Sequence, residues 1–328
     1  MRSVLCLLGT FMVSATVLVA GDADVTNYLL VSNRQGRDIL RYNRDTGELV
    51  DTLVAAGTAG LGVPYGMDIG PDGNLYVTSV TTEQAQDARV LRFNLHTGAF
   101  LGVVADLHPD LQNPLGLTFG PDQKLYVADR HADGSGRVPH YDGPTATYLG
   151  DFTKGSSDLA VPTGLTFGPD GVLYVANLWG GIARFNGTTG ESLGILPTPG
   201  IGSTQFVQFG PDGLLYVTDY FASRTVAYNV STGLMERNLT GGTSGMRFDS
   251  DGSLFVADFW SNRILHFQGD VATVFAAGNP LQTFMDSGAL SGPVDLVLYS
   301  VPEPGAAPLI LGMAATALWI IRRRTRPN

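Results

Sequence analysis

Acidic side chains at the ends of apolar segments are the first residues in this chain that could do chemistry. Three such segments end in Asp129, Asp219 and Asp258. The segment that follows each of them begins with Arg137, Arg224 or Arg263. Where the acid is replaced by asparagine, the arginine is replaced too, giving the pairs Asn33 with Asp38 and Asn177 with Gly181. The exception is Ser79, whose following segment still begins with Arg89. A carboxylate can act as a general acid or base, but this joint variation favours an ion pair between neighbouring strands.

Histidine is the side chain best suited to proton transfer near neutral pH, and the chain contains five. Four fall in predicted turns, strands or loops without a promising partner: His96, His108, His140 and His266. His131, two residues after Asp129, is the one candidate for acid–base chemistry, although a loop histidine is more often solvated or structural. Cys6 is the only cysteine and lies in the N-terminal apolar run, so the remainder offers no thiolate. We assign no catalytic residue, metal ligand or cofactor.

Large aromatic residues form a third group of candidates. They occupy equivalent positions in three successive repeats, each just after a buried segment: Trp179, Tyr220 with Phe221, and Phe259 with Trp260. Exposed rings at such positions can stack on sugar faces or cover apolar side chains of a peptide. The alternative interpretation is that one ring of each pair packs under the adjacent loop. These five residues and His131 are the candidate ligand-binding residues.

These candidates are positioned by a repeat. A ten-residue pattern, Gly-Pro-Asp-Gly-x-Leu-Tyr-Val-Ala/Thr-Asp, recurs with variations at 70–79, 120–129, 168–177, 210–219 and 249–258. Proline at the second position and glycine at the fourth predict a tight turn, which Gln123 departs from in the second copy. The segment after the turn is apolar on both sides, so it predicts a strand with both faces buried.

Each repeat contains four predicted strands, a to d, in a unit of about 45 residues. Strand a precedes the Gly-Pro-Asp-Gly turn, strand b follows it, strand c often begins with arginine, and an Asn/Thr-Gly turn leads to strand d. Four antiparallel strands at this period are typical of a propeller blade. We therefore predict an all-β fold, a six-bladed β-propeller of four-stranded blades. Strands b, c and d of the first blade fall in 28–55 and its strand a in 293–299, so the chain's own ends close the ring.

The topology also predicts two unlike faces. The a-b and c-d turns lie on one side, which we call the uniform face, and the b-c and d-a connections lie on the other, the variable face. Loops that vary on a rigid scaffold commonly carry binding, so we place the candidate function on the variable face. The net charge of the chain is −10, which disfavours nucleic acid as a partner.

The two ends of the chain differ from the repeats. Residues 1–23 contain Arg2, an apolar run and small residues, a composition typical of a secretory signal peptide. After the propeller (24–300) come Val301-Pro-Glu-Pro304, an apolar stretch over 305–321 and Arg322-Arg-Arg324. A helix over 306–321 would be about 24 Å long, close to the thickness of a bilayer core. The arginines predict a cytoplasmic C-terminus and a propeller on the far side of the membrane.

The tail over 301–328 closely resembles the PEP-CTERM sorting signal. The resemblance rests on Pro302, Glu303 and Pro304, the apolar span, and the cluster Arg322, Arg323 and Arg324. It implies a Gram-negative bacterium, an exosortase that recognises the tail, and a mature propeller at the cell surface, in the periplasm or in the extracellular matrix. The alternative is an ordinary C-terminal membrane anchor.

The repeats resemble NHL-repeat propellers and the wider group that includes the gluconolactonase-like and virginiamycin B lyase families. Gluconolactonase-like enzymes hold a divalent metal with acidic and amide side chains just before the glycine of the inner strands. We align those positions with Tyr65, Leu115, Thr163, Gln205, Ser244 and Gly292. None is a carboxylate, so the residues predict no such metal site.

Taken together, the sequence predicts an exported, non-catalytic binding or scaffold module with a polysaccharide or protein ligand on its variable face. The alternative is a metal-independent lyase or hydrolase of the same propeller group, in which His131 would take part.

Overall fold

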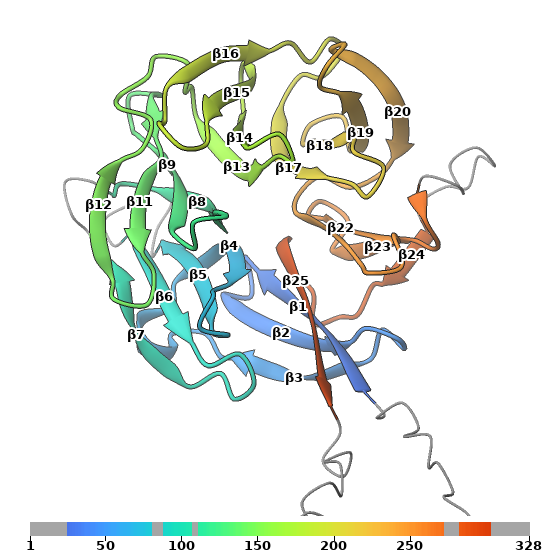
Figure 1. Cartoon of the computed structure of the whole chain (residues 1–328). Helices are drawn as coiled ribbons and strands as arrows, with labels where there is room; N and C mark the ends of the chain where they lie inside the picture. The colour runs from blue at the N-terminus through green and yellow to red at the C-terminus, as the bar shows by residue number, and fades with distance from the viewer. Residues whose placement is uncertain (1–24, 81–87, 107–110, 272–281, 303–328) are drawn as a thin grey trace, which may run out of the picture. The chain divides into compact units, whose positions relative to one another are not determined.

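The computed structural model describes residues 25–80, 88–106, 111–271 and 282–302, and these residues form six antiparallel sheets (Figure 1). Blade 1 consists of β25 (Pro293–Pro302), β1 (Val25–Asn33), β2 (Asp38–Asn43) and β3 (Leu49–Val54). Blade 2 consists of β4 (Val63–Ile69), β5 (Leu75–Val80), β6 (Arg89–Phe93) and β7 (Phe100–Ala105). Blade 3 consists of β8 (Pro114–Phe119), β9 (Leu125–Arg130), β11 (Pro139–Asp142) and β12 (Thr147–Asp151), with a short strand β10 (Gly136–Arg137) beside β9.

The second half of the chain repeats the arrangement. Blade 4 consists of β13 (Pro162–Phe167), β14 (Val172–Asn177), β15 (Gly181–Asn186) and β16 (Ser192–Leu196). Blade 5 consists of β17 (Thr204–Phe209), β18 (Leu215–Asp219), β19 (Arg224–Asn229) and β20 (Leu234–Thr240). Blade 6 consists of β21 (Met246–Phe248), β22 (Leu254–Asp258), β23 (Arg263–Phe267) and β24 (Gln282–Met285). A 3₁₀ turn, η1 (Thr58–Gly60), precedes β4. The predicted six-bladed propeller is confirmed.

The two ends of the propeller meet in blade 1, as the strand count predicts. Strand β25 pairs with β1 at the inner edge of the sheet, and the backbone N–H of Arg34 donates to the carbonyl of Gly292 at 3.0 Å. The Asn33 side chain accepts a hydrogen bond from Ser291 N–H at 2.6 Å. Strand β25 runs to Pro302, three residues beyond the predicted end at Tyr299. Closure therefore gives β1 a pairing partner on the edge that faces the axis.

The Gly-Pro-Asp-Gly turn and the strand after it are joined by a side-chain hydrogen bond that recurs in four blades. The tyrosine hydroxyl of strand b donates to the turn aspartate in the pairs Tyr76–Asp72, Tyr126–Asp122, Tyr174–Asp170 and Tyr216–Asp212, at 2.8 to 3.2 Å. The pKa values of Tyr126, Tyr174 and Tyr216 are raised, first by burial and then by the neighbouring carboxylate. The Asp-to-Tyr spacing in the repeat thus reflects this contact.

The fourth turn position needs a left-handed backbone. Gly73 and Gly213 have φ values of 71° and 76°. Gln123 takes the same conformation, with φ 64°, although it carries a Cβ. The turn therefore forms in blade 3 at some cost in strain.

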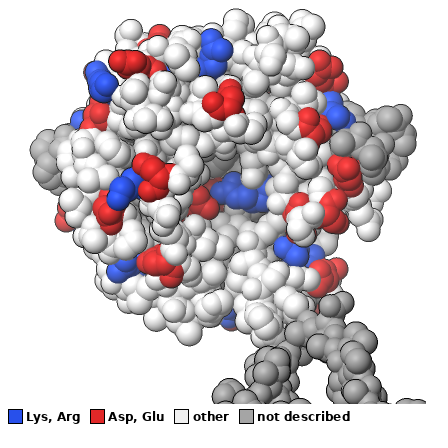
Figure 2. Space-filling model, in the orientation of Figure 1, with Lys and Arg blue, Asp and Glu red and all other residues white. Residues whose placement is uncertain are grey.

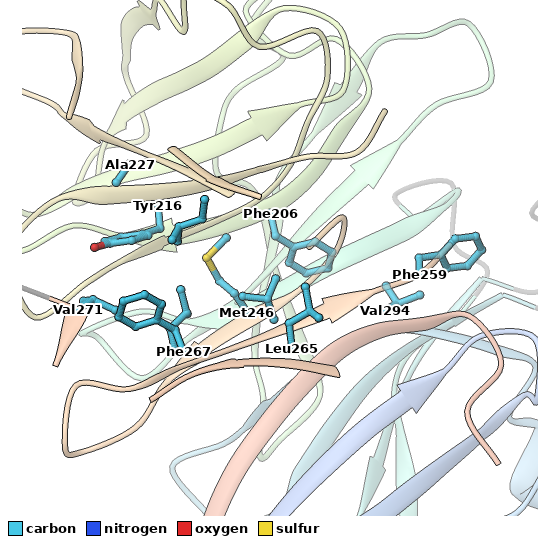
Figure 3. Packing of buried hydrophobic residues seen from close by; sticks show 12 residues of the cluster. Phe206, Tyr216, Ala227, Met246, Phe259, Leu265, Phe267, Val271 and Val294 are labelled. Carbon is cyan, nitrogen blue, oxygen red and sulfur yellow. The ribbon is translucent and has the colours of Figure 1, made fainter. Parts of the chain in front are cut away.

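The core lies between the blades. Strand b is buried on both faces, as predicted. From blade 2 round to blade 1, buried clusters combine residues of two successive sheets. Between blades 5 and 6, Tyr216 and Ala227 pack with Met246 and Phe267 (Figure 3). Nearer the axis, a Cβ added to Gly116 would come within 2.4 Å of the Thr163 carbonyl. Glycine in strand a therefore lets the inner strands approach closely.

The predicted signal peptide (1–23) and the tail from Glu303 to residue 328 lie outside the described residues. Within the described ranges, no helix is long and apolar enough to cross a membrane.

Candidate functional site

Aromatic rings of blades 4, 5 and 6 form a continuous row on the variable face. Trp179 stacks on Phe221 with ring centroids 5.3 Å apart. Phe221 contacts Tyr220 edge to face at 5.2 Å, and Tyr220 contacts Trp260 at 5.2 Å. We call Trp179, Phe221, Tyr220 and Trp260 the aromatic row. All four lie in b-c connections, so the predicted common position brings them into contact across blade boundaries.

The rings of the aromatic row differ in exposure from the ring beneath them. Trp179, Phe221 and Trp260 are 56%, 59% and 59% exposed, whereas Phe259 is 5% exposed. Phe259 packs edge to face against Trp260 at 5.0 Å. In the Phe259–Trp260 pair one ring therefore supports the loop and the other faces solvent, which combines the two alternatives that the sequence left open.

A cation lies beside this cluster. The guanidinium of Arg34, in the b-c connection of blade 1, lies 5.3 Å from the ring centre of Phe259 and 5.1 Å from that of Tyr65. A guanidinium over a ring face is attracted by its quadrupole. Arg34 thereby links the aromatic residues of blade 6 to those of blade 2.

The acids that end strand b are held by the framework of their blades. Asp219 contacts Arg224 at 3.2 Å, Asp258 contacts Arg263 at 3.1 Å, and Asp129 contacts Arg137 at 3.5 Å. The predicted ion pairs across the b-c hairpin are confirmed. In blade 3 the carboxylate also accepts the backbone N–H groups of Gln112 and Asn113.

The same position joins the d-a connection in blades that lack the acid. Asn177 Oδ1 accepts the N–H of Ala160 at 3.0 Å, and Ser79 Oγ accepts the N–H of Gly62 at 2.9 Å. Ser79 thus replaces the acid as an acceptor in blade 2. In blades 1 to 5 the acceptor at this position therefore binds a backbone donor and has a structural role. Asp258 of blade 6 differs, because its contact is with Arg263.

In blade 3, His131 lies beside the acceptor at this position, Asp129. Its Nε2 lies 3.5 Å from an Asp129 carboxylate oxygen, and its Nδ1 lies 3.3 Å from Ser135 Oγ. Asp129 is fully buried, and its oxygens already face Arg137 and two backbone donors. A carboxylate whose oxygens are already engaged in this way is poorly placed to exchange protons with a substrate.

A small polar cavity of about 100 Å³ lies among the inner strands. Its charged lining residues are Asp68, Arg247 and Asp295, and Thr118, Thr166 and Gln208 add polar groups. Figure 2 shows a hollow at the centre of one face in which basic and acidic side chains meet. Asp68, Thr118 and Arg247 each stand just before the final residue of strand a, so the cavity lies toward the a-b turns and the uniform face.

The charged groups of this cavity join three blades. Arg247 of blade 6 lies 3.4 Å from Asp295 of blade 1 and donates to the Met67 carbonyl of blade 2 at 3.0 Å. Asp295 accepts the Met67 N–H at 2.9 Å. Burial raises the pKa of Asp295 to about 6, although the nearby Arg247 opposes the shift. Burial also raises the pKa of Asp68, again against the effect of Arg247.

The positions expected to hold a metal in gluconolactonase-like enzymes do not fit one. Thr163 Oγ1 donates to the carbonyls of Ala176 and Thr204, and Tyr65 lies against Arg34. The alignment of Gly292 was wrong, because a Cβ on Gly245 would lie 2.7 Å from the Cα of Asp295. Asp295 is therefore the blade 1 equivalent of the inner-strand glycine, and Val294 precedes it. These side chains offer no set of hard oxygen ligands.

Sequence reasoning missed the central cavity. The sequence signal for it is a polar residue at the penultimate position of an otherwise mostly apolar strand a. These residues are Asp68, Thr118, Thr166, Gln208 and Arg247. Asp295 carried a second signal, a carboxylate inside Pro293-Val-Asp-Leu-Val.

No family model matches the chain, and no curated protein matches it. Solved structures do match. They include a chain from a nidogen–laminin complex, with a TM-score of 0.64 and 16% identity over 83% of this chain and 98% of that one. A gluconolactonase from Xanthomonas campestris gives 0.56 and 19% identity over 75% and 90%. Virginiamycin B lyase from Staphylococcus aureus gives 0.51 and 14% identity over 87% and 90%.

These similarities establish the class of protein, a six-bladed β-propeller with structural neighbours in the gluconolactonase and virginiamycin B lyase group. At such low identities they show the fold and carry no activity across, because one propeller fold hosts many functions. The expected resemblance to that group is confirmed at the level of the fold.

Proposed function

We propose that this protein is an exported, non-catalytic binding module that holds a polysaccharide against the aromatic row. The observation that carries the proposal is the continuity of four rings across three blades, with Trp179, Phe221 and Trp260 each more than half exposed. A soluble domain rarely leaves large rings together in water unless they contact a partner.

The chemistry of the surface favours a neutral glycan as the ligand. Aromatic rings stack on the C–H faces of sugars, and the net negative charge of the chain opposes a polyanion. The contacts among the rings fix their orientations before binding, so little entropy is lost when a ligand docks.

Export is part of the proposal. It is supported by the signal-peptide-like residues 1–23 and by the PEP-CTERM-like tail, with Pro302, Glu303, Pro304 and the arginine cluster. In this proposal an exosortase processes a membrane-anchored precursor whose C-terminus is cytoplasmic, and the propeller reaches the cell surface, periplasm or extracellular matrix of a Gram-negative bacterium.

A catalytic role as a metal-independent lyase or hydrolase has weaker support. His131 is tied to Asp129 and Ser135, and the central cavity is small and lies toward the other face. Both observations favour binding over turnover at the variable face.

The test is a binding measurement on the full-length protein with a panel of neutral and anionic polysaccharides. Trp260→Ala and Phe221→Ala should each weaken binding by about tenfold or more, as expected for an aromatic anchor. Leu234→Ala is the matched control, because Leu234 is 62% exposed on β20, outside the aromatic row. Two results would contradict the proposal: equal binding by Trp260→Ala and wild type, or a lower melting temperature of the variant without any change in binding.

A further inference from the structure

A second, larger cavity lies where blade 6 meets blade 1 on the uniform face, away from the aromatic row. Its volume is about 390 Å³. Blade 6 contributes the turn around Asp251 together with Phe255, His266 and Phe284, and the c-d turn of blade 1 contributes Arg44 and Asp45. This volume suits a ligand the size of a sugar.

Comparison with the other blades shows what is particular to this cavity. In blades 2 to 5 the tyrosine of strand b donates its hydroxyl to the turn aspartate. Blade 6 has Phe255 at that position. Asp251 accepts the Ser253 N–H at 2.8 Å, a bond that the turn aspartates of the other blades also make. The carboxylate of Asp251 therefore lacks the tyrosine hydroxyl that its equivalents have, and Ser253 is its hydrogen-bond partner.

Blade 3 provides a close reference, because it has the same histidine. His140 stacks on Tyr126 with centroids 5.6 Å apart, and Tyr126 donates to Asp122 at 3.0 Å. In blade 6, His266 stacks on Phe255 at 4.1 Å and meets Phe284 edge to face at 5.3 Å. The two blades share the histidine and its aromatic neighbours but differ in the hydroxyl.

His266 packs against both of these rings, and one of its ring nitrogens makes no hydrogen bond in the described part of the chain. Its Nε2 is buried and has no hydrogen-bond partner within the described part of the chain, whereas His140 Nδ1 lies 2.9 Å from the Gly150 carbonyl. Burial lowers the pKa of His266, so the neutral ring is favoured. A neutral His266 adds no positive charge that would oppose a cationic ligand in the cavity.

The charge of the lining selects the kind of ligand. Asp45, Asp249 and Asp251 face a single guanidinium, Arg44, which lies 3.2 Å from Asp249. Phe255 and Phe284 add ring surface beside the carboxylates. Excess negative charge next to aromatic rings favours an organic cation.

We propose that this cavity binds a small ligand that carries a protonated amine, of the size and polarity of an amino sugar. The ammonium group lies against Asp251, and the side of the ligand covers Phe284 beside the ring of His266. The site is independent of the aromatic row, so it stands whether or not polysaccharide binds there.

Calorimetric titration of the full-length protein with glucosamine and with glucose tests the proposal, in slightly acidic buffer where the amine carries its proton. The two probes differ at one substituent. We expect saturable binding of one glucosamine and at least tenfold weaker binding of glucose. Asp251→Asn should weaken glucosamine binding at least tenfold.

Phe255→Tyr is the sharper variant, because it restores the hydroxyl that four sister blades possess and is therefore compatible with the fold. It should abolish glucosamine binding without lowering the melting temperature. Tyr174→Phe, which removes the same hydroxyl from blade 4, is the matched control and should leave binding unchanged. No saturable binding of glucosamine, equal binding of glucose, or undiminished binding by Phe255→Tyr would each overturn the proposal.

Discussion

Asp295 makes the stability of the propeller depend on pH in a direction that the structure fixes. This carboxyl group is fully buried at the seam where blade 1 meets blades 2 and 6, and burial raises its pKa to about 6 from an ordinary value of 3.8. Because the folded protein holds the proton more tightly than the unfolded chain, the contribution is fully present below about pH 4 and is lost as the pH rises through about 6.

The magnitude follows from the two pKa values. At 1.36 kcal/mol for each pKa unit, the difference between 3.8 and about 6 corresponds to about 3 kcal/mol. Asp295→Asn removes the titration and keeps the shape. The two carboxylate oxygens of Asp295 accept the N–H groups of Met67 and Leu296. The NH₂ group of asparagine cannot accept, so one of these hydrogen bonds is lost in the variant, at a cost that does not depend on pH.

The diagnostic quantity is therefore the difference in free energy of unfolding between the variant and wild type as the pH changes. Urea unfolding followed by circular dichroism should show this difference shifting in favour of the variant by about 3 kcal/mol between about pH 4 and pH 8. Asp133→Asn is a useful control, because hydrogen bonds from Ser135 lower the pKa of Asp133, so its contribution has the opposite sign and changes mainly as the pH falls below 3.8. A difference for Asp295→Asn that stays constant with pH would refute the reasoning.

Three further predictions concern the framework. Gln123→Gly should stabilise the protein by about 0.5 to 1 kcal/mol in urea unfolding, because the strain of φ 64° exceeds the entropy cost of glycine; a loss of stability would contradict this. Arg224→Ala should cost about 1 to 3 kcal/mol, since it leaves the buried Asp219 without its cation, and an unchanged unfolding midpoint would show that the pair is not structural. Removing 291–302 should unfold or oligomerise the chain in size-exclusion chromatography, because it takes away the inner strand of blade 1; a monomer with unchanged melting would disprove the closure.

The fold was predictable because each blade is specified by patterns within its own short stretch of sequence. The turn, the buried strand b and the spacing between repeats all recur, and a blade that lacks its inner strand at the N-terminus must take one from the C-terminus. Even the departure at Gln123 is local, since the rest of the turn supplies enough contacts to impose the backbone conformation.

The sites were less predictable because they depend on contacts between blades. A shared position after strand b placed the rings of Trp179, Phe221 and Trp260 on one face, but the contacts among them come from the rotation of one blade to the next. The central cavity combines Arg247 and Asp295 with a strand about 180 residues before Arg247 in the chain, a proximity that no local pattern encodes. The misplacement of Gly292 has the same origin, because strand a of blade 1 has no turn after it to fix its alignment.

The central claim is that a glycan lies directly on the aromatic row, and tryptophan fluorescence reports on this contact. The chain has three tryptophans, of which Trp179 and Trp260 belong to the row and Trp319 to the tail. In a Trp319→Phe background, titration with the polysaccharide selected from the panel should shift or quench the emission with the same affinity as the binding measurement. Full binding with unchanged emission from Trp179 and Trp260 would contradict the account.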